Sequence, residues 1–360
     1  MAEIKINMKN LYDIPEYMSD VEAVATSDLP WQLLAHRSLM LSGATGLIGS
    51  FLVDVLLYRN EHFGMDCKIF ALGRDRSKAI TRFGHYLNSM VFVPYDINRP
   101  LEMNDIGIVD YVLHLASNTH PIAYATDPIG TITTNIIGTA NMLDFALIHQ
   151  SRRCLFASSN EVYGENRGDV ELFGEDYCGY INCNTLRAGY PESKRCGEAL
   201  CQAYIKQKGL DVVVARLTRS YGPTMLASDT KAVSQFIKKA VQGENIVLKS
   251  QGTQYYSYTY MADAVKGLLT VLLLGETGNA YNIASESSDI MLKDLAGIAA
   301  SATGRNVVFE IPDETEKSGY STATKARLDG SKLNNLGWYP TYNIKSGVER
   351  TISILKKIDE

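Results

Sequence analysis

The chain has 360 residues, 46% of them hydrophobic and 21% charged, and it carries a formal net charge of −5. This length allows one large domain or two moderate ones, and the composition is ordinary for a soluble globular protein. The chain has no Lys/Arg run and no apolar run long enough to span a bilayer, so neither nucleic acid nor membrane is an expected partner.

Six cysteines are scattered along the chain without a Cys-x-x-Cys pair or an accompanying His cluster. The pattern predicts reduced thiols in a cytoplasmic protein, and no metal site is expected. The N-terminus lacks the apolar core of a secretory signal. Residues 1–35 are expected to form an arm with one or two helical turns near Ser19 to Thr26, packed on the body or on a second subunit.

A glycine-rich turn follows the first predicted strand, 38–41, and precedes an amphipathic helix, 50–59. In this turn Gly43, Gly46 and Gly49 have the spacing Gly-x-x-Gly-x-x-Gly. Glycines let the backbone approach a pyrophosphate closely, and the start of a helix offers free N–H groups to an anion. The context therefore predicts a dinucleotide site, with a tight turn that holds no ligand as the alternative.

The end of the second predicted strand, 68–72, bears on the choice between NAD and NADP. Dinucleotide folds often place a carboxylate here to bind the ribose hydroxyls. This chain has Arg74, which is suited to a 2′-phosphate and favours NADP, while Asp75 leaves NAD open. Beyond the third strand, Asp96 is a candidate for adenine recognition, and the alternative is that it caps a turn.

Further strands are predicted at 91–93 and 111–117, and a long helix is predicted from Asn135 through Ile148. Strands alternate with helices throughout this part of the chain. The alternation predicts an α/β fold with a doubly wound parallel sheet of the Rossmann type. His114, on an apolar strand, is expected to be a core residue.

Polar residues follow the fifth predicted strand, 154–157, where ligands bind in open α/β sheets. A hydroxyl such as that of Ser159 can donate to a substrate oxygen and steady a developing carbonyl. The carboxylate of Glu161 can move a proton on a carbon made acidic by a neighbouring ketone. A polar turn without chemistry is the alternative.

Tyr190 and Lys194 follow with the spacing Tyr-x-x-x-Lys. On a helix, residues four apart share one face. A cation beside the Tyr hydroxyl favours the phenolate, so the pKa of Tyr190 is expected to be lowered. Such a Tyr can take a proton from a substrate alcohol while hydride leaves the same carbon. Without this context the spacing is also typical of a solvated helix face.

Together these segments resemble the extended short-chain dehydrogenases/reductases, in the nucleotide-sugar epimerase/dehydratase group. The motifs are Gly43-x-x-Gly46-x-x-Gly49, Leu115-Ala116-Ser117, Asn135-x-x-Gly138-Thr139, Ser158-Ser159-x-Glu161-Val162-Tyr163-Gly164, Tyr190-x-x-x-Lys194, and Arg216-Leu217 leading to Tyr221-Gly222-Pro223. They occur in family order over residues 38–290. The resemblance implies that Ser159 is the catalytic Ser/Thr, that Tyr190 is the acid/base, and that Lys194 is its partner.

The resemblance also implies binding residues and an assembly. The cofactor-binding residues would be Gly43, Thr45, Gly46, Leu47, Ile48, Gly49, Arg74, Asp96, Ile97, Leu115, Ala116, Ser117, Asn135, Tyr190 and Lys194. The substrate-binding residues would be Ser159, Asn160, Arg187, Arg219 and Tyr256. A homodimer would form through the helices around residues 140 and 195. We expect a Rossmann domain over 36–217, with 255–290 returning to it, and a substrate lobe made of 218–254 and 291–360.

Within the group, the nearest likeness is to UDP-glucuronate decarboxylases and sugar 4,6-dehydratases, carried by 180–190 and 232–254. Three positions depart from those patterns. Dehydratases have an Asp where this chain has Asn160, which disfavours dehydration because an amide does not readily donate a proton. Decarboxylases have an Arg near the place of Tyr256, which disfavours decarboxylation. A family Asn is replaced by Arg219, which can still bind phosphate.

The sequence therefore predicts an NAD(P)-dependent enzyme that oxidises C4 of a nucleotide-diphosphate sugar to a 4-keto intermediate. Return of the hydride would then give an epimer or a decarboxylated sugar. An NADPH-dependent 4-keto-sugar reductase is the second hypothesis, and Arg74 favours it. A cofactor-binding scaffold without turnover is the third, although such proteins usually lack the Tyr or the Lys. The sequence names neither the sugar nor the base.

Overall fold

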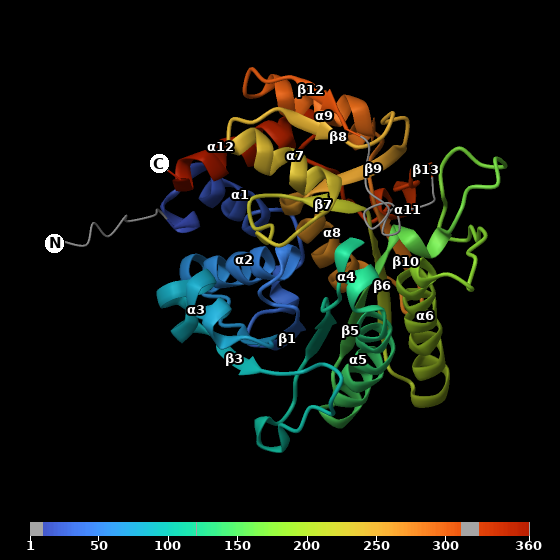
Figure 1. The fold of residues 1–360 in the computed structure, drawn as a ribbon. Helices are drawn as coiled ribbons and strands as arrows, with labels where there is room; N and C mark the ends of the chain where they lie inside the picture. Colours follow the sequence, from blue (N-terminus) through green and yellow to red (C-terminus); the bar gives the residue numbers. More distant parts are fainter. Residues whose placement is uncertain (1–9, 120, 311–323, 360) are drawn as a thin grey trace.

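A seven-stranded parallel sheet forms the centre of this computed structural model, which describes residues 10–119, 121–310 and 324–359 (Figure 1). In spatial order the strands are β10 (Ala280–Ile283), β6 (Val212–Leu217), β5 (Arg153–Ser159), β4 (Tyr111–His114), β1 (Ser38–Ser42), β2 (Lys68–Gly73) and β3 (Val91–Pro94). Every neighbouring pair is parallel. This order confirms the predicted Rossmann-type sheet.

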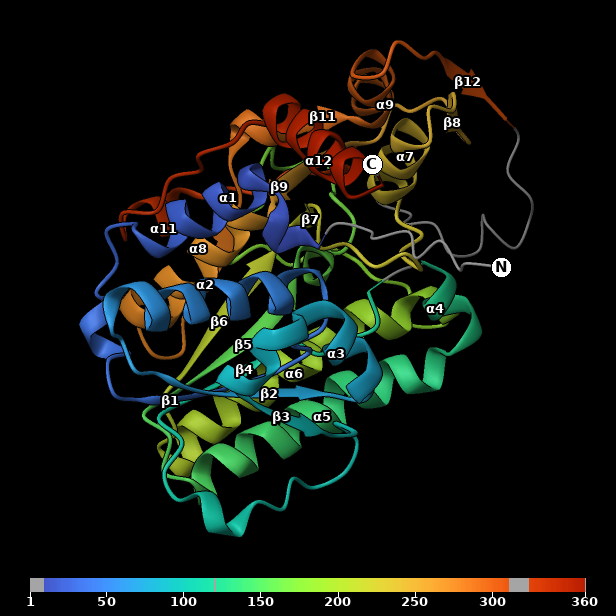
Figure 2. The ribbon, with the colours of Figure 1, turned by 90° about the vertical axis from the view of Figure 1, so that its left-hand side faces the viewer.

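Helices cover both faces of this sheet (Figure 2). One face carries α5 (Pro128–Ile148) and α6 (Gly189–Lys208), and the other carries α2 (Leu47–Phe63), α3 (Arg76–Phe83) and α8 (Met261–Leu274). Side chains on a strand alternate between faces, so each strand contributes to two cores. On β5, for example, Leu155 packs with the α2 and α8 side, while Phe156 packs with the α5 and α6 side.

The strand order of the central sheet reverses at β1. From β1 the chain moves outward to β2 and β3 and then crosses back to β4, which lies on the other side of β1. The carboxyl ends of β1 and β4 therefore lie at the reversal point, which is where ligands bind in such sheets.

The part of the chain from β7 onward adds two small sheets beyond the carboxyl edge of the central one (Figure 1). One contains β11 (Asp289–Met291), β9 (Tyr255–Tyr260), β13 (Lys325–Ala326) and β7 (Arg219–Tyr221), and the other contains β8 (Ile246–Leu248) and β12 (Val307–Phe309). Their helices are α7 (Ala232–Val241), α9 (Leu292–Ser301), α11 (Ser331–Asn334) and α12 (Ile344–Asp359). Only Thr218 separates β6 from β7, so this part begins directly at the end of a central strand.

The remaining described elements are short. They are η1 (Leu11–Asp13), α1 (Pro15–Ala25), η2 (Trp31–Leu33), η3 (Gly84–Ser89), η4 (Asn104–Ile106), α4 (Pro121–Thr126), η5 (Asn160–Tyr163), η6 (Leu186–Ala188) and η7 (Glu286–Ser288). Among the helices within the described ranges, none combines the length and the apolar character that crossing a membrane requires.

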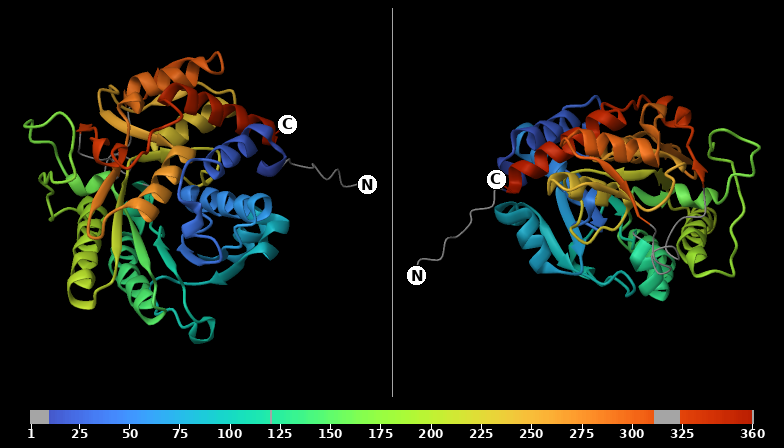
Figure 3. Two further views of the ribbon diagram at one scale, coloured as in Figure 1. Left: turned by 180° about the vertical axis from the view of Figure 1, so that it is seen from behind. Right: turned by 45° about the horizontal axis from the view of Figure 1, so that its top comes forward.

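Helix α1 ties the N-terminal segment to the body and lies beside α12 (Figure 3). The fully buried carboxylate of Asp20 accepts hydrogen bonds from the hydroxyls of Tyr260 (2.6 Å) and Tyr342 (2.5 Å) and from Nε of Arg350 (2.8 Å). The helix is longer than the predicted turns because Pro15, at its first position, is already preset for helical φ. Of the two expected placements, residues 10–35 take the one on the body.

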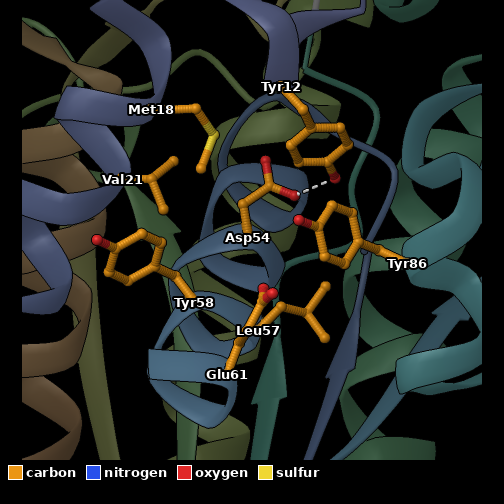
Figure 4. A pocket seen from close by; sticks show the side chains of 8 residues that line it. All are labelled: Tyr12, Met18, Val21, Asp54, Leu57, Tyr58, Glu61 and Tyr86. Carbon is orange, nitrogen blue, oxygen red and sulfur yellow. Dashed lines mark hydrogen bonds between the residues drawn. The ribbon is translucent and has the colours of Figure 1, made fainter. Parts of the chain in front are cut away.

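A small cavity lies between this segment and α2, as Figure 4 shows. The hydroxyl of Tyr12 donates to Oδ1 of Asp54 (2.7 Å), and the same carboxylate binds Tyr17 and Arg82. The lining residues are Tyr12, Met18, Val21, Asp54, Leu57, Tyr58, Glu61 and Tyr86. The volume is about 20 Å³, which holds about one water molecule. The cavity is therefore not a substrate site.

The prediction that a helix begins at Asn135 was wrong, because α5 begins at Pro128. Its N-cap is Asp127, whose carboxylate accepts a hydrogen bond from the backbone N–H of Gly130 (3.0 Å). A capping Asp followed by Pro is a strong start signal, and it outweighs the Thr and β-branched residues of the first two turns.

Candidate active site

The glycine turn after β1 forms a cradle that larger residues cannot fill. A Cβ on Gly49 would lie 2.2 Å from the carbonyl oxygen of Gly43, and one on Gly43 would lie 2.9 Å from the backbone N of Ala116. Gly43 also has a φ of +74°, which disfavours any other residue. Gly46 caps α2, whose first turn holds no acidic residue to compete with an anion. The turn therefore fits the pyrophosphate of a dinucleotide.

Neighbouring segments hold this turn in place. The hydroxyl of Ser42 accepts hydrogen bonds from the backbone N–H groups of Leu115 and Ala116 (3.1 Å each), which fixes the end of β4 against the end of β1. The hydroxyl of Thr224, which follows β7, donates to the carbonyl oxygen of Leu47 (2.7 Å). The predicted cofactor residues Thr45 and Ile48 are half-buried in the same turn.

The residues predicted to contact the adenosine end of the cofactor are mostly exposed. The carboxylate of Asp75 caps α3 and accepts from two backbone N–H groups, at 2.8 and 3.2 Å. Arg74 is exposed and has no ion pair with any residue the structure describes, so it is open to a phosphate. Asp96 is exposed and accepts from the backbone N–H of Asn98 (3.1 Å), as a turn cap does. Ile97 is buried against α5.

Asn135 connects the cofactor side with the helix that carries Tyr190. Its side-chain oxygen accepts from Ser117 (2.9 Å), and its side-chain amide donates to the hydroxyl of Ser193 (3.0 Å). Ser193 in turn donates to the carbonyl oxygen of Tyr190 (2.8 Å). Asn135 is fully buried, so this chain of hydrogen bonds fixes the first turn of α6 relative to the end of β4.

Tyr190, Ser159 and Lys194 converge at the end of β5. Tyr190 lies in the first turn of α6, and its buried side chain is hydrogen-bonded to Ser159, the last residue of β5. Lys194, also buried, donates to the carbonyl oxygen of Ala157 (2.8 Å), and its ammonium lies over the ring of Phe156 at 4.8 Å. The helix therefore presents both side chains to the same strand end.

The prediction of a lowered pKa for Tyr190 was wrong for this structure. Burial, with the negative charge of Glu161 added to it, raises the pKa of Tyr190 to about 12. Hydrogen bonds from Ser159 and Tyr124 act in the opposite direction without prevailing. Burial also lowers the pKa of Lys194 to about 7, so near neutral pH only part of the Lys194 population is protonated.

Glu161 and Arg187, predicted for catalysis and for substrate binding, form a partly buried ion pair (2.6 Å). The guanidinium of Arg187 also lies over the ring of Tyr124, 4.8 Å from its centroid. Tyr124, from α4, is buried beside Tyr190 and was missed in the sequence. The signal available in the sequence was an aromatic residue three positions after Pro121, in the short segment that follows β4.

Arg219 and Tyr256, both predicted to bind substrate, lie together. Arg219 on β7 pairs with Tyr258 on β9, and its guanidinium lies 3.6 Å from the ring centroid of Tyr256. Asn160 is buried directly after Ser159, in η5. No group of three or more His, Cys, Asp or Glu side chains with metal-binding geometry is present in the part of the chain that the structure describes.

Comparison with known proteins identifies relatives of this arrangement. Residues 39–284 match the model of the NAD dependent epimerase/dehydratase family. UDP-glucuronic acid decarboxylase 1 of Xenopus tropicalis is 32% identical over 332 residues, covering 89% of this chain and 73% of the relative. UDP-glucuronic acid decarboxylase 6 of Arabidopsis thaliana is 33% identical over 317 residues, covering 87% of each.

Solved structures share the fold at lower identity. UDP-glucose 4-epimerase of Thermotoga maritima superposes with a TM-score of 0.77 at 22% identity, covering 90% of this chain and 100% of that one. The dTDP-glucose 4,6-dehydratase DesIV of Streptomyces venezuelae superposes with a TM-score of 0.75 at 23% identity, covering 88% and 96%. The similarity extends over both the central sheet and the C-terminal part.

Proposed function

The chain belongs to the NAD-dependent epimerase/dehydratase family and is a nucleotide-sugar-modifying enzyme, and we propose that Tyr190 starts its reaction by taking the proton of the sugar C4 hydroxyl. The observation that carries this proposal is the convergence of Tyr190, Ser159 and Lys194 at the end of β5. The shape of the glycine cradle fits NAD, which would serve as the hydride acceptor when bound.

The neighbouring side chains have distinct roles in this proposal. Ser159 donates a hydrogen bond to the C4 oxygen as it becomes a carbonyl. The ammonium of Lys194 stabilises the phenolate of Tyr190 while the proton is held there. Glu161, held by Arg187, accepts a proton from a carbon next to the 4-keto group, where the ketone makes C–H bonds acidic.

We propose that the hydride returns to the sugar, giving an epimer or a decarboxylated product without net redox change. The named relatives are UDP-glucuronic acid decarboxylases, which supports a product of this kind. Asn160 argues against dehydration because its amide does not readily donate a proton. In the sequence, Tyr256 disfavours decarboxylation because decarboxylases have an Arg near its place. In the structure, however, the guanidinium of Arg219 lies over the ring of Tyr256 and so brings a guanidinium to that place.

A reductase that consumes NADPH is the second candidate, and the exposed guanidinium of Arg74 at the end of β2 favours it. NAD is the cofactor of the family model, and a preference for NADP is the finer proposal. A scaffold without turnover is disfavoured, because the buried Tyr190 and Lys194 are both in place.

Tyr190→Phe tests the proposal. With UDP-, dTDP-, GDP- and CDP-sugars and either cofactor, product is followed by mass spectrometry. We expect turnover to fall by about 10²- to 10⁴-fold, as for loss of a general acid/base, while NAD binding stays unchanged. Tyr339→Phe, at a residue 61% exposed, is the matched control. Full activity of Tyr190→Phe would contradict the mechanism. Net oxidation of NADPH by the wild type would identify a reductase.

We propose in addition that the protein is a homodimer formed through α5 and α6. Support comes from α5, which leaves Ile129, Ile137 and Ile148 exposed at 76%, 43% and 67%. Light scattering should give twice the chain mass for the wild type and the single mass for Ile137→Glu. The cytoplasmic location stays a prediction, supported by six cysteines that are all free thiols.

A further inference from the structure

Ser42 and His114 end two neighbouring strands of the central sheet, and their side chains meet. Ser42 is the last residue of β1 and His114 the last of β4, and the two are register partners. Both are buried, and Oγ of Ser42 lies 2.8 Å from Nδ1 of His114. The backbone N–H groups of Leu115 and Ala116 reach the same Oγ at 3.1 Å each. Three polar groups therefore surround one hydroxyl.

The proton of the Ser42 hydroxyl has only one of these groups to go to. A hydroxyl has one proton and two lone pairs. The N–H groups of Leu115 and Ala116 are donors, and they occupy the two lone pairs. The hydroxyl therefore donates to Nδ1 of His114, which makes the imidazole neutral with its own proton on Nε2. Burial and the charge of Lys194 act in the same direction, because they lower the pKa of His114 to about 3.

The other nitrogen of this ring receives nothing in return. Nε2 of His114 is buried and has no hydrogen-bond partner among the residues that the structure describes. The ring instead packs beside that of Phe156, with 5.8 Å between the centroids. A buried N–H group without an acceptor costs folding free energy, and an apolar side chain at this position would avoid that cost. What distinguishes His114 from an apolar residue here is the acceptor at Nδ1.

The backbone that Ser42 holds is also the surface on which the glycine turn rests. A Cβ on Gly43 would lie 2.9 Å from the backbone N of Ala116 and 3.0 Å from the carbonyl carbon of Leu115. The turn therefore packs directly on these two residues, and a shift of their backbone would remove its support. N–H groups that bind an anion do so most tightly when they are already in place, because binding then costs no ordering.

We propose that Ser42 and His114 are positioning residues for the cofactor. His114 accepts the hydroxyl proton of Ser42, Ser42 fixes the backbone of Leu115 and Ala116, and this backbone holds the turn at Gly43 in the form that receives the pyrophosphate. The inference rests on the NAD site of the function proposed above and is independent of the sugar. Both side chains act through the backbone, without contact to the cofactor.

The first test reads the proton on His114 directly. The full chain is labelled with ¹⁵N-histidine, and nuclear magnetic resonance near neutral pH reports which ring nitrogen of each histidine carries a proton. The chain has six histidines, and the signals of His114 are those missing from the spectrum of His114→Asn. We expect a neutral ring with its proton on Nε2, both with and without NAD. A proton on Nδ1, or a charged ring, would contradict the proposal.

The second test measures NAD affinity by titration calorimetry. Leu and Asn have the same branched shape, but only Asn offers an acceptor near the place of Nδ1. We expect NAD to bind about tenfold more weakly to His114→Leu and to Ser42→Ala, and His114→Asn should recover most of the affinity. The double variant Ser42→Ala/His114→Leu should lose no more than either single variant, because the two side chains act as a unit.

Cys154→Ala is the control for lost packing. Cys154 is buried and lines the same small cavity as His114, so its truncation should lower the melting temperature while NAD affinity stays within about twofold. Equal losses for His114→Leu and His114→Asn, additive losses in the double variant, or unchanged affinity in Ser42→Ala would each overturn the proposal. Failure of the wild type to bind NAD or NADP would instead refute the cofactor site of the proposed function, and the positioning role with it.

Discussion

The ring of Tyr124 stacks on the ring of Tyr190, with 4.7 Å between the centroids and 26° between the planes. A hydrogen bond between the two side chains lowers the pKa of Tyr190, against burial and the charge of Glu161, which raise it. The guanidinium of Arg187 covers the same Tyr124 ring. Helix α4 therefore both orients the phenol of Tyr190, the proposed acid/base, and eases its ionisation.

Replacing Tyr124 with Phe should keep the stack and lose the hydrogen bond. The pKa of Tyr190 then rises, so the phenolate forms at a higher pH and the turnover profile moves to the alkaline side. We expect kcat near neutral pH to fall roughly tenfold, which corresponds to one pKa unit or about 1.4 kcal/mol. The measurement is kcat against pH with saturating cofactor. Tyr124→Leu removes the stack as well and should lose more; an unshifted profile for Tyr124→Phe would contradict the role.

Glu198 lies one helical turn beyond Lys194, and its carboxylate accepts hydrogen bonds from Ser158 (2.5 Å) and from Nε of Arg216 (3.0 Å). Its negative charge raises the pKa of Lys194, which burial lowers to about 7. The pKa of His114 falls to about 3 through burial and the charge of Lys194, while burial raises that of Cys201 to about 12. The side chains of His114 and Cys201 are thus both neutral near pH 7. Glu198 is therefore the main charged group that sets the pKa of Lys194.

Glu198→Gln should therefore lower the pKa of Lys194 further. The ammonium is present only below that pKa, so the alkaline limb of the kcat profile should move to lower pH. Ser158→Ala removes a hydrogen bond from the carboxylate without removing its charge, and its profile should stay close to that of the wild type. The idea is wrong if both variants show the same limb as the wild type while their melting temperatures match.

Arg74 should decide between the two nicotinamide cofactors. Arg74→Gln removes the exposed guanidinium at the end of β2, and we expect NADP affinity to fall about tenfold, or about 1.4 kcal/mol, with NAD affinity unchanged. Arg76→Gln, at the exposed first residue of α3, is the control. Titration calorimetry with both cofactors measures the effect. Equal loss for NAD and NADP would mean that Arg74 does not recognise the 2′-phosphate.

Asp20 should be a major determinant of stability. Asp20→Ala removes the acceptor shared by Tyr260, Tyr342 and Arg350, and leaves a partly buried guanidinium without its ion pair. We expect the free energy of unfolding to fall by about 3–5 kcal/mol, as for loss of one member of a buried pair. Glu22→Gln, on an exposed position of the same helix, should change it by less than about 0.5 kcal/mol. Urea denaturation gives both values, and similar midpoints would refute the assignment.

Local signals accounted for the fold. The apolar runs of β1 and β5, the glycine turn between β1 and α2, and the Tyr-x-x-x-Lys helix are each encoded in neighbouring residues. Parallel strands bring their carboxyl ends to one edge, so residues at those ends could be grouped before the structure was known. This reasoning brought Ser159 and Glu161 together with Tyr190.

Long-range contacts were beyond such reasoning. The stack of Arg219 on Tyr256 depends on the pairing of β7 with β9, and the sequence alone does not specify that register. The stack of Tyr124 on Tyr190 depends on the path of a segment between strands. The pKa of Tyr190 depends on how deeply the whole fold buries it, and for that reason a prediction from helix spacing had the wrong sign.

The hydrogen bond from Thr224 to the carbonyl of Leu47 joins the segment after β7 to the start of α2. Thr224 follows β7, the strand of Arg219, and Leu47 begins the helix whose start is predicted to bind the cofactor phosphates. A ligand that orders one of these segments also reduces the freedom of the other. We therefore expect binding at the two predicted sites to be cooperative, and by thermodynamic linkage each ligand should tighten the binding of the other by the same factor.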